Sequence, residues 1–181
     1  GVELEVRDVD SNGIGELVTR GDNVMMGYFE NKLATEKVLK DGWLYTGDLG
    51  HVDSDGFFYV TGRKKNVIVT KNGKNIYPEE VEAYLNNSPY ILESLVFGHE
   101  DESSGETYVN ASIVPDVDAI MEKLHTSEPS DESIYDLINN EVKAINKTMP
   151  LYKRVRSFKI RYEEFVKTTT KKIKRYAEKA V

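Results

Sequence analysis

Three stretches of the sequence combine charged residues or glycines in patterns that could bind or transform an anionic substrate. The first, GWLYTGDLG at residues 42–50, places Asp48 directly after a Thr-Gly turn and between aromatic residues. A fixed carboxylate can accept two hydrogen bonds at once, which suits a vicinal diol such as a ribose. The same aspartate could equally support a type I turn, and the residues alone leave these two interpretations even.

The second stretch, GRKKNVIVTKNGKNIYPEEVE at residues 62–82, sets a glycine and three cations before a buried-looking apolar segment and an Asn-Gly turn. Arg63 could hold a ribose or phosphate oxygen, and Gly73 would allow the backbone to approach a ligand closely. Taken alone, this pattern is more typical of a solvated hairpin.

The third stretch, FVKTTTKKIKRY at residues 165–176, is basic within a chain of formal net charge −7. Residues 153–175 carry ten Lys or Arg against Glu163 and Glu164, which predicts a positive surface. Such a run is usually a solvated face, sometimes a patch for nucleic acid or anionic membranes, and only occasionally a catalytic loop. The chain has neither a strongly basic balance nor a nucleic-acid-binding motif, which weakens the interpretation as a non-catalytic anion- or nucleic-acid-binding module.

Composition limits the other classes of function. The 181 residues are 39% hydrophobic and 30% charged, as in ordinary globular domains. No apolar run reaches the roughly 20 residues of a membrane span, and no secretory signal is seen, so we expect a cytoplasmic protein. Cysteine is absent, and His51, His99 and His125 lie far apart without ligand spacing, so no metal site is expected from this chain alone.

Hydrophobic periodicity predicts an α+β fold in two parts. Residues 1–61 show short strands at 3–10, 15–21 and 57–62 and a short helix at 34–39, which indicates the end of a small β-barrel or sheet. The remainder predicts a compact α+β domain.

Particular residues define the elements of this second part. A helix begins at Pro78 and carries Val81, Tyr84 and Leu85 on one apolar face. Strands are predicted at 91–98, 106–115 and 155–162, the last with Tyr162 on its apolar side. Residues 115–133 form a polar excursion that leaves room for a helix, and a helix capped by Ser133 runs to Pro150.

The order and spacing of GELVTRGDNVMMGYFENKLAT, GWLYTGDLG, GRKKNVIVTKNGKNIYPEEVE and KTTTKKIKR resemble the C-terminal portion of the adenylate-forming superfamily, which includes AMP-forming acyl-CoA synthetases, luciferases and peptide-synthetase adenylation domains. The resemblance covers nearly the whole chain. It implies the end of a large N-terminal domain at 1–61, a hinge at 62–66 and a mobile C-terminal α+β domain at 67–181. The first residues carry no initiator Met, as in a fragment.

The resemblance also implies a role for five residues. Asp48 would bind the ribose hydroxyls of ATP, and Arg63 would contact the same nucleotide. Lys65 would be the hinge residue, and Gly73 would lie in the loop that lines the pantetheine channel. Lys172 would be the catalytic lysine. Two positions depart from the family pattern, because Val166 replaces a proline and Lys171 replaces the glycine before the catalytic lysine, so Lys171 competes for its role.

By this resemblance the chain belongs to a long-chain fatty acyl-CoA ligase. Such an enzyme uses a fatty acid, ATP, CoA and Mg2+, and the missing N-terminal domain would bind most of these. We expect the isolated fragment to be inactive, without nucleic-acid partners or a transmembrane segment, while peripheral membrane association stays open. The alternatives are an aryl or short-chain acyl-CoA ligase and a ligase that loads a carrier protein.

Overall fold

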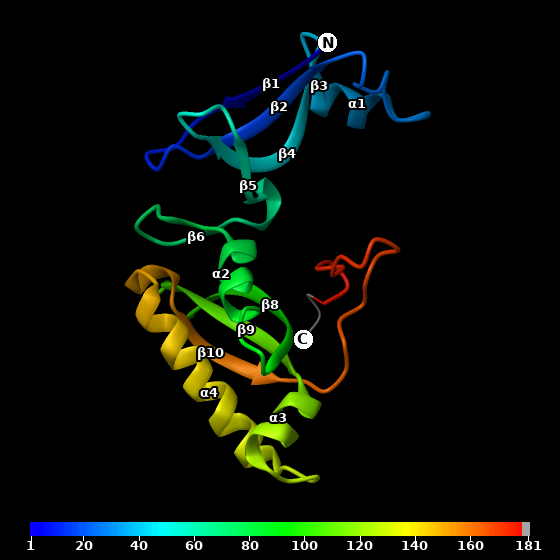
Figure 1. Cartoon of the computed structure of the whole chain (residues 1–181). Coiled ribbons are helices and arrows are strands. Elements are labelled where there is room, and N and C mark those ends of the chain that lie inside the picture. Colours follow the sequence, from blue (N-terminus) through cyan, green and yellow to red (C-terminus); the bar gives the residue numbers. More distant parts are fainter. Residues whose placement is uncertain (179–181) are drawn as a thin grey trace. The chain divides into compact units, whose positions relative to one another are not determined.

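The computed structural model describes residues 1–178. These residues form two compact units, and the division falls between Val67 and Ile68 (Figure 1). Both units mix strands and helices, so the expected α+β class is confirmed.

The N-terminal unit is built on a five-stranded antiparallel sheet in which β4 is the longest strand and pairs with β2, β3 and β5. Its elements are β1 (Val2–Arg7), β2 (Gly15–Gly21), α1 (Lys32–Val38), β3 (Leu39–Lys40), β4 (Trp43–Val52), β5 (Phe58–Arg63) and the 3-10 turn η1 (Lys64–Asn66). Trp43 is buried, and the guanidinium groups of Arg7 and Arg20 lie 4.2 and 4.7 Å from the centroid of its ring.

The C-terminal unit contains a three-stranded sheet in the order β10-β9-β8, in which β8 and β9 are antiparallel and β9 and β10 are parallel. A separate hairpin pairs β6 with β7. The elements of this unit are β6 (Ile68–Val69), β7 (Asn75–Ile76), α2 (Pro78–Leu85), β8 (Ile91–Glu100), β9 (Thr107–Pro115), α3 (Val117–Leu124), α4 (Asp131–Thr148), η2 (Leu151–Lys153) and β10 (Val155–Ile160).

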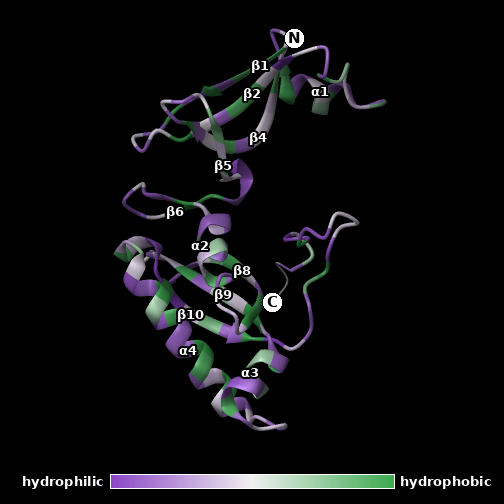
Figure 2. Ribbon diagram, in the orientation of Figure 1, coloured by the Kyte–Doolittle hydropathy of each residue, from purple (hydrophilic) through white to green (hydrophobic). Residues whose placement is uncertain are grey.

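The two faces of this sheet are covered differently. Val109, Ala111 and Ile113 of β9 alternate onto the face that packs against α2 and α4 in the main core. Along α4, green hydrophobic residues recur among purple polar ones in Figure 2, as expected for a helix with one buried side. The opposite face carries a small cluster in which Leu95 and Val114 pack against Phe165 of the C-terminal segment. That segment therefore lies on the sheet as a cover.

Two predicted helix starts were wrong by two or three residues. The N-cap of α4 is Ser130, whose side chain accepts a hydrogen bond from the Ser133 N–H, so Ser133 lies inside the helix. The acidic residues that follow Ser130 favour this earlier start because they lie at the positive end of the helix dipole. Helix α1 likewise begins after Asn31, whose side chain accepts from the Ala34 N–H.

Two predictions for apolar or extended residues also fail, and a third holds only in part. Tyr84 stays 42% exposed, because the buried side of α2 is formed by Pro78, Val81 and Leu85. Tyr162 does not continue the strand, because β10 ends at Ile160. The Tyr162 hydroxyl donates to Asp131 of α4. The apolar segment at 67–69, expected to be a buried strand, is confirmed only in part: β6 is a two-residue strand in which Ile68 is buried and Val69 is 56% exposed.

Candidate active site

The first candidate site residues meet across two strands of the N-terminal unit. Asp48 of β4 is the register partner of Arg63 of β5, and Arg63 Nε lies 2.9 Å from Asp48 Oδ1. The guanidinium also donates to the Thr46 carbonyl at 2.8 Å. Their side chains are 34% and 48% exposed. A pair this open to water contributes only about 0–1 kcal/mol, so both groups can exchange this contact for one with a ligand at little cost.

The part of β4 that carries Asp48 is held by partly buried polar contacts. The Thr46 hydroxyl donates to the Leu17 carbonyl at 2.7 Å and accepts from the Asp48 N–H at 3.0 Å. Gly47 adopts φ +72°, a conformation that favours glycine, and its N–H donates to Glu16 Oε1 at 3.0 Å. The Thr-Gly turn expected before Asp48 is therefore not formed, because Thr46, Gly47 and Asp48 lie within β4, where these contacts fix the backbone.

Glu16 is an anchor that the sequence patterns did not single out. Its carboxylate is 6% exposed and accepts from Lys64 Nζ at 2.8 Å. This hydrogen bond raises the pKa of Lys64. Because Glu16 also holds Gly47, a single carboxylate connects the part of β4 that carries Asp48 to the residue after Arg63. No local sequence pattern marks Glu16, because its partners Gly47 and Lys64 lie 31 and 48 positions away.

Lys65, the predicted hinge residue, lies in η1 and is exposed. The division between the two compact units follows two residues later. The hinge at 62–66 and the domain bounds stay predictions.

Gly73 lies in a tight hairpin turn that joins β6 to β7. Its φ is +72°, its N–H donates to the Thr70 carbonyl at 2.8 Å, and the Thr70 N–H donates to the Lys74 carbonyl at 3.0 Å. A Cβ at Gly73 would meet nothing within 4 Å. Lys71 Nζ donates to the Ser104 carbonyl at 3.0 Å, which ties the turn to a neighbouring loop. The glycine is required by the backbone and leaves the tip of the turn open.

Lys172 closes a second tight turn, in the C-terminal segment. The Thr168 N–H donates to the Lys172 carbonyl at 2.8 Å, the Lys171 N–H donates to the Thr168 carbonyl at 2.9 Å, and Lys167 and Ile173 form a β-bridge. Lys171 occupies the left-handed region at φ +60°. Lys172 is exposed, and within residues 1–178 its ammonium group has no hydrogen bond or ion pair.

The predicted positive surface needs a correction, because internal carboxylates neutralise much of it. Within the described residues, four of the ten cations at 153–175 form ion pairs. These pairs are Lys153–Glu80, Arg161–Glu178, Lys167–Glu93 with Glu164, and Arg175–Glu82 with Glu79. Lys171 and Lys172 stand at the tip, away from these carboxylates. Within the described residues, the six cations of this stretch without an ion pair are Arg154, Arg156, Lys159, Lys171, Lys172 and Lys174.

Buried carboxylates hold the base of the Lys172 turn. Glu93 is 10% exposed at its side chain and accepts from the Phe165 N–H at 2.8 Å, while Lys167 Nζ lies 2.9 Å from its other oxygen. Glu178 is 8% exposed, pairs with Arg161 at 2.6 Å and accepts from the Val166 N–H. These contacts lower the pKa of Glu178, with the Val166 N–H as the largest cause.

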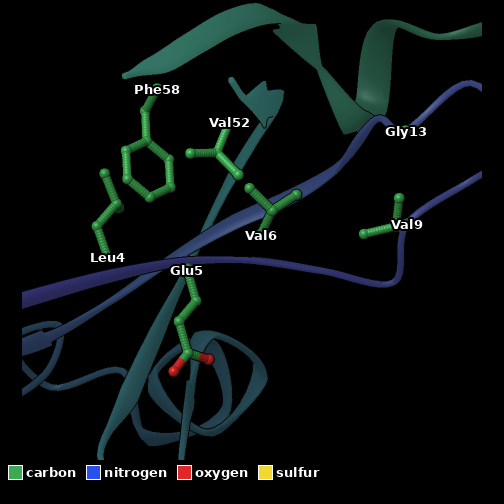
Figure 3. Close-up of a pocket in the computed structure, with 7 residues that line it drawn as sticks. All are labelled: Leu4, Glu5, Val6, Val9, Gly13, Val52 and Phe58. Atoms are coloured by element: carbon green, nitrogen blue, oxygen red, sulfur yellow. The ribbon is translucent and has the colours of Figure 1, made fainter. Parts of the chain in front are cut away.

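A cavity of about 490 Å³ lies in the N-terminal unit. Figure 3 shows apolar side chains around it and the Glu5 carboxylate directed away from them. None of the predicted site residues lines it; the lining residues are Leu4, Glu5, Val6, Val9, Gly13, Val52 and Phe58. In the described part of the chain, no helix has both the length and the apolar character for a membrane span, and no cluster of potential metal ligands occurs.

The N-terminal sheet thus carries the exposed Asp48–Arg63 ion pair, and the C-terminal unit carries two lysine-bearing turns. Residues 65–179 match the family described as the AMP-binding enzyme C-terminal domain. The chain belongs to this family.

Sequence relatives are CoA ligases of more than one kind. A long-chain-fatty-acid–CoA ligase of Mycobacterium tuberculosis is 36% identical over 176 residues, which cover 89% of this chain and 28% of that protein. An indoleacetate–CoA ligase of Aromatoleum aromaticum is 48% identical over 108 residues, 60% of this chain and 21% of that protein. The chain thus spans about a quarter of the length of these relatives.

Solved structures agree with the family. The o-succinylbenzoate CoA synthetase of Bacillus subtilis, in complex with an acyl-adenylate intermediate, matches with a TM-score of 0.76 and 29% identity over 99% of this chain and 34% of that one. The same enzyme has been solved with ATP and a magnesium ion, at a TM-score of 0.74 and 30% identity over 98% of this chain and 34% of that one.

Proposed function

We propose that this chain is the C-terminal part of an ATP-dependent, AMP-forming ligase that activates a carboxylic acid as an acyl-adenylate and transfers the acyl group to CoA. Residues 1–61 would then end the large N-terminal domain, and residues 62–66 would be the hinge before the mobile domain at 67–181. The observation that carries the proposal is the Lys172 turn. It is a preformed loop whose base is held by the ion pairs of Lys167 and Arg175, while the Lys172 ammonium group at its tip has no hydrogen bond or ion pair within residues 1–178.

The chemistry of the first step explains the need for such a lysine. A carboxylate oxygen attacks the α-phosphorus of ATP, a new P–O bond forms, and pyrophosphate leaves with the electrons of the bond that breaks. Negative charge gathers where carboxylate and phosphate oxygens meet. An ammonium group held there stabilises the transition state, and loss of one such contact commonly lowers the rate by about 10²- to 10³-fold.

The Asp48–Arg63 pair fits the nucleotide end of the same reaction. The Asp48 carboxylate can accept hydrogen bonds from the ribose hydroxyls, and the Arg63 guanidinium can donate to nucleotide oxygens. Their partial exposure and preformed backbone support this assignment. Mg2+ would neutralise phosphate charge. Within residues 1–178 no cluster of potential metal ligands occurs.

The second step transfers the acyl group to the thiol of CoA, with AMP as the leaving group. We propose that the domain turns at Lys65, withdraws Lys172 and brings the Gly73 turn to the pantetheine arm. The open space beside Gly73 supports this role, because a narrow chain can pass close to a backbone without a side chain. Such domain movements often gate the steps of a reaction.

For the acid we propose a long-chain fatty acid. The relative from M. tuberculosis supports this choice, since the alignment includes 89% of the chain. An aryl acid is the second candidate, favoured by the 48% identity to an indoleacetate–CoA ligase. We also propose a cytoplasmic location for this ligase.

The test is carboxylate-dependent exchange between ATP and pyrophosphate by the full-length ligase, measured with long-chain, aryl and short-chain acids. We expect exchange with long-chain acids and a fall of about 10²- to 10³-fold in Lys172→Ala. Preformed acyl-adenylate should still yield thioester in this variant. Lys171→Ala is the matched control, and a larger loss in that variant than in Lys172→Ala would transfer the role to Lys171. No exchange with any acid would contradict the proposed function.

A further inference from the structure

Arg175 and Glu82 form a buried ion pair that bridges 93 positions of the sequence. The Arg175 Nη2 atom lies 2.6 Å from one carboxylate oxygen of Glu82 and 2.5 Å from the other. Their side chains are 19% and 13% exposed. The guanidinium group is held at two points, because Nη2 donates to the carboxylate while Nη1 donates to the Val96 carbonyl.

The same pair also binds the outward backbone groups of Val96, on the edge strand β8. Val96 of β8 donates its N–H to Glu82 Oε1 at 2.7 Å, and its carbonyl accepts from Arg175 Nη1 at 3.0 Å. Three elements thus meet at one point: α2 through Glu82, β8 through Val96 and the C-terminal segment through Arg175. A buried backbone group left without a partner costs about 1–3 kcal/mol, so the arrangement resists small displacements.

The pair lies close to the Lys172 turn along the chain. Arg175 follows Lys172 by three residues, and three residues span at most about 10 Å. The Lys174 N–H donates to the Val166 carbonyl at 2.7 Å, which continues the ladder between the turn and Arg175. A fixed Arg175 therefore fixes the base from which Lys172 projects.

We propose that Glu82 and Arg175 are positioning residues for Lys172, and that their ion pair holds the turn at 168–172 in the place required for the adenylation step. This inference rests on the proposed role of Lys172. It does not extend to the thioester step, because the Gly73 turn has separate supports in the β6–β7 pairing and the Lys71–Ser104 contact.

Protonation of Glu82 provides a further readout. Burial raises the pKa of Glu82 to about 7, although the Arg175 guanidinium and the Val96 N–H act in the opposite direction. Glu79, on the same helix, also raises it and itself lies 3.6 Å from Arg175 Nε. Below pH 7 the carboxyl becomes neutral and attracts Arg175 less strongly. The adenylation rate should therefore rise with pH through this range, relative to the thioester step.

The experiment compares Arg175→Met, Arg175→Lys and Glu82→Gln with Arg156→Met, which removes an exposed arginine that stacks on Tyr108 instead of pairing with a carboxylate. In the full-length ligase, Arg175→Met should lower ATP–pyrophosphate exchange by about 10²-fold, as expected for a displaced catalytic group. The KM for ATP and the conversion of preformed acyl-adenylate to thioester should remain at wild-type values. Arg175→Lys should recover part of the exchange, and Glu82→Gln should lose the pH dependence near 7.

Either equal losses in both half-reactions or an unchanged exchange rate in Arg175→Met would overturn the inference. Hydrogen exchange at the Thr168 and Lys172 amides of the 181-residue chain supplies a test that needs no catalysis. Faster exchange in Arg175→Met than in Arg156→Met supports the proposed contact, and identical protection contradicts it. If the wild-type ligase were inactive with every acid, the proposed function would fail while this amide measurement still decided whether the pair holds the turn.

Discussion

The two turns of the C-terminal unit, residues 70–74 and 168–172, have the same backbone design. In each, the first residue is a threonine that exchanges backbone hydrogen bonds with the fourth and fifth residues, and its hydroxyl accepts from the N–H of the fifth, at 3.0 and 3.1 Å. The fourth residue is left-handed in both, at φ +72° and +60°. Lysine is the fifth residue in both, as Lys74 and Lys172. One local solution thus serves both proposed half-reactions.

The turns differ in how they satisfy the left-handed position. Gly73 adopts it freely, whereas Lys171 carries a side chain in a conformation that costs roughly 1–2 kcal/mol for an L-residue. The glycine turn is flanked by two residue pairs of the β6–β7 hairpin, and the lysine turn by a single β-bridge with ion pairs at its base. The lesson is that a strained turn can be kept in place from outside, by charges that titrate, when its own residues do not favour it.

The strongest way to separate the turns is to place a β-branched side chain at Gly73. Gly73→Val forces a branched residue to φ +72° and fills the open space beside the backbone. We expect thioester formation from preformed acyl-adenylate to fall by about 10²-fold, as for a displaced reacting group, while ATP–pyrophosphate exchange persists. Gly56→Val, at φ +85° in the N-terminal unit with equally open surroundings, is the control. Parallel losses in both half-reactions would refute separate roles for the turns.

A second comparison uses pH. The pKa of Glu82 is about 7 in the folded chain against an ordinary value of 4.5, so the folded state binds more protons between these values. The free energy of unfolding should therefore fall as pH rises from about 4.5 to 7, with a slope of at most about 1.4 kcal/mol per pH unit, and then level off. Amide exchange at Val96 measures this, and Glu82→Gln should remove the slope. A slope that survives in Glu82→Gln belongs to another group.

Relieving the strain of the second turn should make it resemble the first. Lys171→Gly is expected to stabilise the turn by about 1 kcal/mol, because glycine adopts positive φ without a steric cost. Protection of the Lys172 amide from hydrogen exchange is the measurement. Thr169→Gly, at a position of the same turn without positive φ, should reduce protection instead, and a gain there would mean that the effect of glycine is not specific to position 171.

The smallest expected effects come from the two threonines. Thr70→Ala and Thr168→Ala each remove one hydroxyl acceptor, which should destabilise its turn by about 1 kcal/mol. The loss of amide protection should extend over more residues of the turn in Thr168→Ala than in Thr70→Ala, because Lys171 lacks the conformational freedom of Gly73. Amide exchange of Lys74 and Lys172 reports each turn. If Thr70→Ala were the more damaging, the glycine turn would be the less robust of the two.

Sequence patterns predicted the parts of this design that are local. The Asn-Gly turn, the Pro78 helix start and the apolar faces of the long helix all follow from neighbouring residues. The left-handed Lys171 was beyond such patterns, since lysine disfavours that region. The anchors Glu16 and Glu82 were also missed, because their partners are distant in sequence and only the folded chain brings a buried carboxylate to a cation.

The way Val96 is satisfied has a consequence for solubility. An outer strand with unpaired backbone groups is a template for association with another chain, and natural proteins block such edges with charges or covering segments. Here the outward N–H of Val96 donates to the Glu82 side chain, and the outward carbonyl of Val96 accepts from the Arg175 side chain. A variant without the segment that carries Arg175 would expose the Val96 carbonyl on this edge strand. We expect such a variant to self-associate, although the removed segment forms no strand of the sheet.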